Sequence, residues 1–516
     1  MARAVLLHGK DPVVRRLAQE IITTQQAEMG VMRRQLAANP APAPAPAAAS
    51  RERAVPVAAE KASAVSSRDR VYTGDQISNT VSVIDPASNK LLGVVRLGDP
   101  FSAALSPLYK GALLVHGLGF SPDHRTLAVV SIGSNSVTLI DTATNAVKGT
   151  IYVGRSPHEA FFTPDGRELW VAVRGENYLA VLDPVAMKET RRIAVANGPG
   201  MVLFRPDGRY AFVPSSFTPE LAVIDTATHE IVARVKQASP FSPNLAVSAD
   251  GAEVWFTLKD IGKAQVMRAE PPFDAIATLD IGPICNHVAL VDNAAGKFAY
   301  LTVGGQNEVQ VWRRGAKPEL VTRIPTGDLP HGIWPSPDGT RIYIGLENGD
   351  AVQAIDTAAN KVIATIPVGQ LPQALVYVPD AVPRGDDTAN LIPLGDAGKA
   401  AHLQLVPAAG ADAKAQGNVV VNALGQLDHL QISATGLEPG REYQLSLVTA
   451  RVAPFGERTP LTKAKANPAG AVLAQALGPL RQVVPRADAS EKSEPRFLLL
   501  TAVEGDQPVL VQKATP

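Results

Sequence analysis

A repeat with a period of about 42 residues constrains the fold of this chain more than any other feature. The aspartates of Pro-Asp-Gly turns, or of close relatives of that turn, recur at intervals of 42, 42 and 43 residues, at Asp123, Asp165, Asp207 and Asp250. Asp338 follows after 88 residues, which is twice 44, and Asp380 after another 42. A degenerate copy with its turn glycine at Gly296 fills the gap. The period predicts that one supersecondary unit is repeated along the middle of the chain.

Four short apolar runs make up each copy. The first precedes the Pro-Asp-Gly turn, the second follows it, the third ends in Ile-Asp-Thr or a relative, and the fourth ends in Val-Gly. The third ending is clearest at residues 140–142, 224–226 and 355–357. Four strands in a period of about 40 to 45 residues are typical of one blade of a β-propeller.

The two ends of the repeat region complement each other. Residues 71–98 contain only the second, third and fourth runs, and residues 371–380 contain only a first run. Joined in one sheet, they complete a blade and bring the total to seven. We therefore predict that residues 371–378 pair with residues 71–75, which closes the ring and removes its free edges.

Composition argues against several other classes of protein. Of the 516 residues, 46% are apolar and 19% charged, and 49 basic side chains balance 49 acidic ones. Nothing in this bulk charge recruits nucleic acid or an anionic membrane. No run approaches the roughly 18 apolar residues of a transmembrane segment. The single cysteine, Cys285, excludes an internal disulfide and a CxxC motif. We expect a folded protein of two or three domains.

The segment VYTGDQISNTVSVIDPASNKLLGVVRLG, residues 71–98, resembles the YVTN-type repeat of YncE-like bacterial seven-bladed propellers. The resemblance covers roughly residues 70–380. It implies a propeller fold and, because such propellers are habitually exported, a periplasmic or extracellular location. It implies no single function, since propellers of this kind bind ligands, build structures or catalyse reactions.

The flanks follow other patterns. Residues 1–36 are predicted to hold one amphipathic helix, which resembles the final helix of domain-of-unknown-function family 305 but lacks that family's upstream His-His segment. This partial match favours a natural start upstream of Met1. Alanine and proline dominate the start of a linker at 37–70, the propeller spans 71–380, and a second linker spans 381–400. Alternating apolar and polar residues over 401–516 predict an immunoglobulin-like β-sandwich. The predicted fold class is therefore mainly β.

Several catalytic motifs are missing. His158 and Glu159 do not begin a zinc-binding HExxH, because Phe162 occupies the place of the second histidine and the segment reads as a strand. There is no GxSxG elbow, and the pair Gly117 and Gly119 lacks the third glycine of a nucleotide loop. We therefore expect a non-catalytic binding protein. The alternative is a metal-dependent enzyme, either a lactonase-like hydrolase or a copper oxidoreductase.

Candidate ligands gather where the first strand of each blade begins. Aligned on the turn, this entry position is occupied around the ring by His116, His158, Gly200, Pro243 or Asn244, His287, His331 and Gln373. Four of the chain's nine histidines thus share one predicted position near the axis. Convergent imidazoles at a channel mouth suit a transition metal, copper or zinc.

Polar neighbours on the same face complete the predicted site, which would bind a metal, a small ligand or a protein partner. They are Glu159, Arg174, Glu176, Asn286, Asn307 and Glu308. Glu159 would supply negative charge or orient an imidazole, and Arg174 would attract an anionic group. An equally weighted alternative is structural: each histidine caps its strand entry by a hydrogen bond to the backbone of the neighbouring blade.

Overall fold

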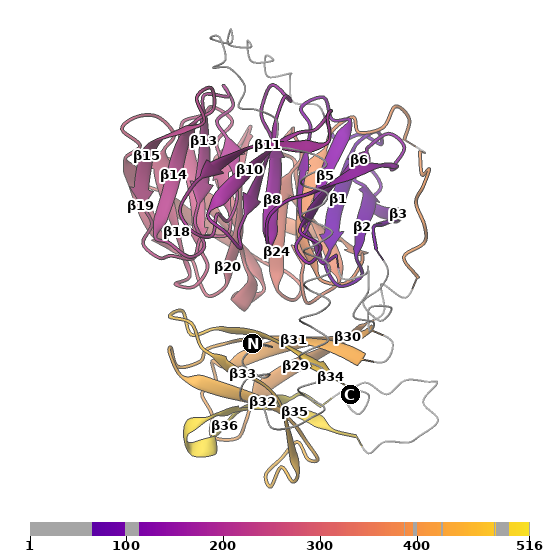
Figure 1. Cartoon of the computed structure of the whole chain (residues 1–516). Coiled ribbons are helices and arrows are strands. Elements are labelled where there is room, and N and C mark those ends of the chain that lie inside the picture. Colours follow the sequence, from indigo (N-terminus) through magenta and orange to yellow (C-terminus); the bar gives the residue numbers. More distant parts are fainter. Residues whose placement is uncertain are drawn as a thin grey trace, which may run out of the picture. The chain divides into compact units, whose positions relative to one another are not determined.

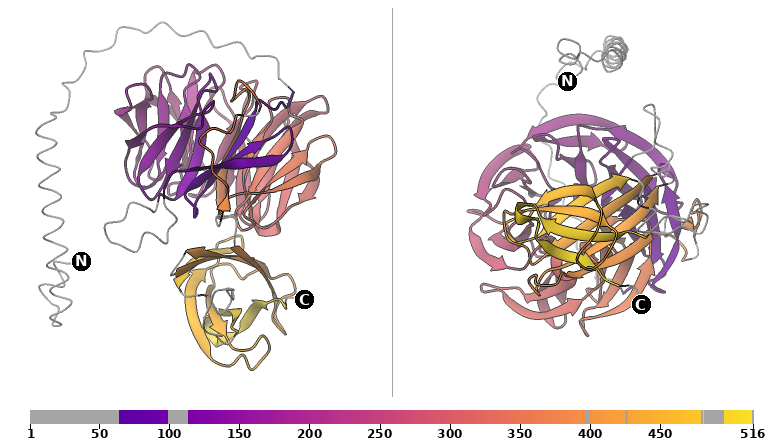
Figure 2. Two further views of the ribbon diagram at one scale, coloured as in Figure 1. Left: turned by 90° about the vertical axis from the view of Figure 1, so that its right-hand side faces the viewer. Right: turned by 90° about the horizontal axis from the view of Figure 1, so that it is seen from below.

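Seven four-stranded antiparallel sheets form a β-propeller (Figures 1 and 2). The computed structural model describes residues 64–98, 113–385, 387–395, 400–424, 427–478, 480 and 495–514. The predicted N-terminal helix and most of the first linker lie outside these residues. The seven-bladed, mainly β fold predicted from the repeat is confirmed.

The blades follow one another along the chain, with the closing blade built from both ends of the repeat region. Blade 1 consists of β28 (Pro372–Val378), β1 (Arg70–Asp75), β2 (Thr80–Asp85) and β3 (Lys90–Arg96). Blade 2 consists of β4 (Val115–Phe120), β5 (Thr126–Ser131), β6 (Ser136–Asp141) and β7 (Val147–Tyr152). Blade 3 consists of β8 (Pro157–Phe162), β9 (Leu169–Val173), β10 (Tyr178–Asp183) and β11 (Lys188–Ala194). Blade 4 consists of β12 (Leu203–Phe204), β13 (Tyr210–Pro214), β14 (Glu220–Asp225) and β15 (Glu230–Lys236).

The remaining blades repeat the same order. Blade 5 consists of β16 (Leu245–Val247), β17 (Glu253–Leu258), β18 (Lys263–Arg268) and β19 (Ala275–Asp280). Blade 6 consists of β20 (Cys285–Asn293), β21 (Gly296–Val303), β22 (Glu308–Arg313) and β23 (Glu319–Pro325). Blade 7 consists of β24 (Pro330–Pro335), β25 (Arg341–Leu346), β26 (Ala351–Asp356) and β27 (Lys361–Pro367).

Local chemistry explains why the Pro-Asp-Gly turn repeats. In blade 3, the Asp165 carboxylate accepts hydrogen bonds from the Thr163 hydroxyl at 2.6 Å and from the Arg167 backbone N–H at 3.1 Å. Gly166 follows with φ +69°, a left-handed conformation that glycine adopts without strain. The strand that directly follows this turn, β9, is the second strand of the blade and is buried along its whole length. Each turn therefore joins a first strand to a buried second strand.

The ring closes as predicted. Strand β28 pairs antiparallel with β1, in a register that places Val71 opposite Tyr377 and Tyr72 opposite Val376. In Figure 1, orange β28 lies beside indigo β1. The pairing of residues 371–378 with residues 71–75 is thus confirmed, and it completes blade 1 from two segments about 300 residues apart.

The C-terminal region forms a single eight-stranded sheet that curls into a nearly closed, sandwich-like barrel. Its strands, in the order β33-β32-β35-β36-β29-β30-β31-β34, surround their own apolar core. They are β29 (Ala400–Pro407), β30 (Gln416–Leu424), β31 (Leu427–Thr435), β32 (Glu442–Val448), β33 (Arg458–Lys465), β34 (Val472–Gly478), β35 (Phe497–Ala502) and β36 (Pro508–Gln512). The predicted β-sandwich is confirmed as a sandwich-like β domain, although hydrogen bonds join all eight strands into one continuous sheet, and its immunoglobulin-like type stays a prediction.

Polar side chains connect this barrel to blades 6 and 7. The Gln431 amide of β31 donates to the Glu347 carboxylate at 2.7 Å, and the Thr435 hydroxyl donates to the Gly305 carbonyl at 3.0 Å. Val420 of the barrel also packs with Leu371 of the propeller. Among the described residues, no helix is long and apolar enough to cross a membrane.

Candidate functional site

In blades 1, 2, 3, 6 and 7, the entry of the first strand contains a β-bulge that leaves two successive residues between regular pairs. In blade 3, Pro157 pairs with Val173 and Ala160 pairs with Val171, which leaves His158 and Glu159 between the two pairs. The same bulge contains His116 and Gly117 in blade 2, and His331 and Gly332 in blade 7. The bulge thus defines an entry position, held by His158, and a next position, held by Glu159.

The register corrects one alignment. In blade 6, Cys285 pairs with Val303 and Val288 with Leu301, so Asn286 occupies the entry position and His287 the next one. Three histidines therefore share the entry position, and His287 is the structural equivalent of Glu159. The alignment error arose because blade 6 lacks the Pro-Asp-Gly turn used as its reference point.

All four imidazoles nevertheless converge on the axis. The ring centroids of His116 and His158 lie 4.3 Å apart, those of His287 and His331 lie 4.6 Å apart, and those of His116 and His331 lie 6.3 Å apart. All four side chains are buried. The predicted convergence of the histidines is therefore present in the structure.

One ring nitrogen of two entry-position histidines is bound to the scaffold. Nδ1 of His158 donates to the Gly200 carbonyl at 2.6 Å, and Nδ1 of His331 donates to the Gln373 carbonyl at 2.9 Å. Nδ1 of His116 is buried and has no such partner among the described residues. The structural role proposed for the histidines is thus present in His158 and His331. Because a carbonyl only accepts, the Nδ1 proton of His158 and His331 is fixed and Nε2 retains its lone pair.

Burial keeps these imidazoles neutral. Burial, helped by the positive charge of Arg174, lowers the pKa of His116 to about 3. Burial and the charge of Lys259 likewise lower the pKa of His287 to about 3. The pKa values of His158 and His331 are also well below the ordinary value, mainly because of burial. Neutral imidazoles are the form that binds metal ions.

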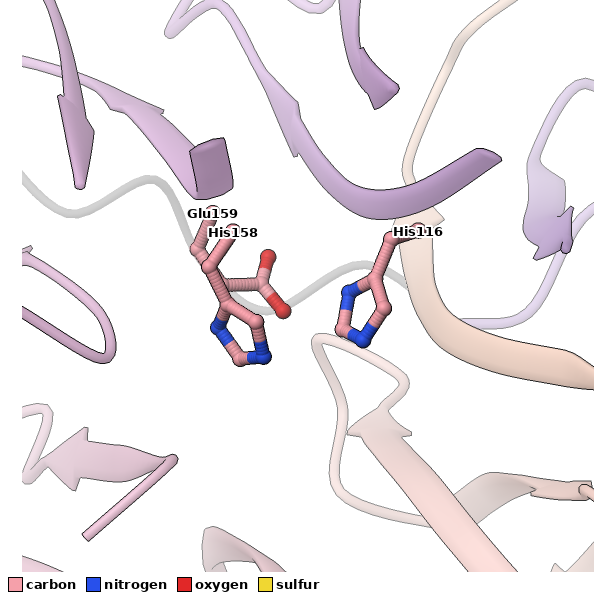
Figure 3. A group of neighbouring side chains, drawn as sticks. All are labelled: His116, His158 and Glu159. Atoms are coloured by element: carbon pink, nitrogen blue, oxygen red, sulfur yellow. The ribbon is translucent and has the colours of Figure 1, made fainter. Parts of the chain in front are cut away.

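Glu159 brings a carboxyl group to two of these rings. The candidate ligand atoms of His116, His158 and Glu159 all lie within 4.8 Å of one another, and all three residues are buried (Figure 3). Burial raises the pKa of Glu159 to about 8, so without a cation the carboxyl holds its proton at neutral pH. Gly117 makes the approach possible, because a Cβ at this position would lie 2.6 Å from Glu159 Oε2 and 2.1 Å from the His158 carbonyl oxygen.

A polar cavity of about 390 Å³ lies over this cluster, and we call it the chamber. Entry-position side chains form its floor, and barrel residues that include Gln431, Leu473 and Gln475 form its roof. Arg174 and Lys259 supply two positive charges, whereas Glu347 is the single carboxylate in the described lining. A second, more apolar cavity of about 270 Å³ is lined by Glu159 and His287, as expected from their shared position.

Lys259 and Glu347 were not predicted, although a signal for them exists. Both residues, like Arg174, directly follow the second strand of their blades, since β17 ends at Leu258, β25 at Leu346 and β9 at Val173. Aligning the copies at the end of the second strand, as well as at the turn after the first, would have revealed this position.

Three predicted ligands are used elsewhere. Glu176 accepts a hydrogen bond from the Arg155 backbone N–H, Asn307 holds Asp328 and the Leu329 backbone, and Glu308 binds Gln310 and Arg323. None of the three lines the chamber. Asn286 likewise donates its amide to the Pro330 carbonyl at 2.7 Å. These four side chains connect turns and blades, and their assignment to a ligand site stays a prediction.

Fold and site together define a seven-bladed β-propeller with a buried histidine cluster at one mouth of its channel. No protein-family model matches the chain, and no curated protein matches it either. The YVTN-type subtype therefore stays a prediction.

Many solved structures resemble the fold, and three of them give the following comparisons. A chain of hydrazine synthase from Kuenenia stuttgartiensis is 21% identical, with a TM-score of 0.49, over 54% of this chain and 93% of that one. A functionally unknown protein from Desulfotomaculum acetoxidans is 11% identical, with a TM-score of 0.51, over 60% and 98%. The periplasmic gluconolactonase of Pseudomonas aeruginosa is 20% identical, with a TM-score of 0.48, over 60% and 99%. At identities this low, the similarity shows a shared fold alone.

Proposed function

We propose that this protein binds a transition-metal ion, zinc or copper, through His116, His158 and Glu159. The proposal rests on one observation, the approach of three buried ligand atoms to within 4.8 Å of one another. Two imidazoles and one carboxylate form a donor set that such ions accept.

Three features of the ligands support the proposal. Nδ1 of His116 is buried and has no hydrogen-bond partner among the described residues. Metal-binding histidines usually donate their other ring N–H to a carbonyl or carboxylate, as His158 does to Gly200. Ionising the buried Glu159 carboxyl group alone is costly. A cation bound in place of its proton would remove that cost. A bound ion would add positive charge beside the chamber, which His116 and His158 line.

The roof narrows the choice of occupant. Because barrel side chains cover the histidine mouth, a macromolecular partner would have to displace the barrel before it touched His158. A metal ion or a small molecule needs no such displacement. We therefore favour a small occupant over the protein partner that the sequence also allowed. The observations support binding and single out no reaction.

The test is metal binding by purified protein after removal of metal with a chelator. We expect calorimetry with Zn²⁺ and Cu²⁺ to show one tight site per chain. Replacing His158 with alanine should weaken binding by more than the roughly 10- to 100-fold cost of losing a residue that only supports a ligand. Glu159→Gln, which keeps the shape of the side chain, should weaken binding as well.

His331→Ala is the matched control. Like His158→Ala, it removes one imidazole and one hydrogen bond to a backbone carbonyl of the neighbouring blade. Both variants should lose about 1 kcal/mol of stability or more for that reason, but only His158→Ala should lose tight metal binding. Equal metal affinities in the two variants, or a wild-type protein that binds neither ion, would refute the metal site.

A further inference from the structure

We propose that the chamber also binds a small organic carboxylate, recognised by Arg174 and Lys259. The inference shares the chamber with the proposed metal site but does not depend on a metal. It starts from two cations that have no ion-pair partner within the described part of the chain.

The Arg174 guanidinium lies against two aromatic rings. It lies 5.7 Å from the ring centroid of Phe217 and 5.1 Å from that of Phe241. Contacts of this kind orient the group without using its N–H donors, and Nε is buried without a hydrogen-bond partner. The N–H edge of an arginine is suited to the two oxygens of a carboxylate.

Lys259 adds a second positive charge to the same lining. Burial lowers the pKa of Lys259, the Glu347 carboxylate opposes this change, and the charge of Arg174 adds to it, so the two cations sense each other. One oxygen of Glu347 accepts a hydrogen bond from the Gln431 amide, and this single carboxylate faces two cations in the described lining. Two like charges in a partly dry cavity repel each other, and an anion between them would relieve the repulsion.

The rest of the lining favours an organic anion. Phe241 and Leu473 offer apolar surface beside the cations, while the amides of Gln76, Gln373 and Gln475 offer hydrogen bonds. A carbon skeleton that carries hydroxyl or carbonyl groups would use both kinds of contact, whereas inorganic phosphate would use only the polar ones. The volume of about 390 Å³ suits a small molecule.

The test is calorimetric titration of the full chain with L-malate, first after chelator treatment and then with Zn²⁺ added. We expect the metal-free protein to bind malate, and to bind inorganic phosphate about 10-fold more weakly or worse. Arg174→Met and Lys259→Met, which keep apolar bulk and remove the charge, should each weaken malate binding by about 10- to 100-fold. Arg313→Met is the matched control, because Arg313 also lies over an aromatic ring, that of Phe298 at 5.3 Å, but outside the chamber. It should bind malate like the wild type.

Four results would overturn the inference. Three of them are absence of malate binding up to about 10 mM, unchanged binding in both chamber variants, and phosphate binding as tight as malate binding. Malate binding that requires Zn²⁺ would also overturn it, because the ion would then be the recognising group. Malate binding without any Zn²⁺ or Cu²⁺ site would uphold the inference and refute only the metal proposal.

Discussion

Asp75, the last residue of β1 in the closing blade, should make the protein less stable as the pH rises. Its carboxyl group is fully buried, and Oδ2 accepts hydrogen bonds from the Thr80 hydroxyl at 2.8 Å and the Ser82 hydroxyl at 2.7 Å. Oδ1 has no partner among the described residues. Burial raises the pKa of Asp75 from 3.8 to about 8, against the opposing effect of the two hydroxyls.

The direction of this pH dependence follows from the number of protons that the folded and unfolded states bind. Between pH 3.8 and about 8 the folded protein keeps the Asp75 proton and the unfolded chain loses it. The free energy of unfolding therefore falls as the pH rises through this window, is unaffected below it, and stays at its lower value above it. At 1.36 kcal/mol for each pH unit, the full cost is about 6 kcal/mol.

The variant Asp75→Asn keeps the shape of the side chain and removes the titration. Urea unfolding with tryptophan fluorescence at pH 4, 6 and 8 measures the effect. The variant should match the wild type at pH 4, within the cost of altered hydrogen bonds, and exceed its stability increasingly toward pH 8. Ser82→Ala should extend the decline to above pH 8, which a further measurement at pH 9 would show, because it removes a hydrogen bond that favours the ionised carboxylate and so raises the pKa of Asp75 further. A stability difference between Asp75→Asn and wild type that does not change with pH would refute the reasoning.

Three further predictions test the closure of the ring, the bulge that contains Gly117, and the burial of the Cys285 thiol. Val376→Pro should lower stability by about 3 kcal/mol or more in a thermal or urea melt, because it breaks the β28–β1 ladder. The control Lys148→Pro lies in an exposed bulge of the outer strand β7 and should lower stability less. Equal losses of stability in the two variants would contradict the importance of ring closure. Gly117→Ala should lower the free energy of unfolding by about 1–3 kcal/mol through overpacking against the His158 carbonyl, and it should also weaken Zn²⁺ binding. In the control Gly478→Ala the added Cβ meets nothing within 4 Å, so this variant should melt like the wild type. Cys285 is buried, and burial raises the pKa of its thiol, so a thiol-reactive dye should label it only after unfolding; rapid labelling of the native protein would contradict this.

The propeller could be predicted because its signals are local. A turn such as the one at Asp165 needs an aspartate and a glycine at fixed positions. Most blades contain a turn of this kind, so the same residues recur along the sequence. Closure followed from counting strands at the two ends of the repeat. The gathering of histidines followed from the same alignment, since equivalent positions in a ring must face the same axis.

The rest depends on contacts that sequence spacing does not encode. His287 was placed one residue out of register because β20 runs on for nine residues to a turn of another kind. Lys259 was overlooked, although it shares its repeat position with Arg174. The roof could not be predicted, because it forms only when the barrel docks through residues such as Gln431. The YVTN-type subtype, the extracytoplasmic location and the helix like that of family 305 stay predictions.

The closing pair of strands also has a consequence for synthesis. The Tyr377 hydroxyl binds the Asp69 carboxylate at a distance of 308 positions along the chain. A ribosome that adds about 5–20 residues each second needs roughly 15–60 s between these two residues. Throughout that interval β1 has a free edge, which is the kind of surface that chaperones cover and that promotes aggregation. The chamber is likewise incomplete until blade 1 and the barrel have been made, because Gln373 and Gln475 both line it.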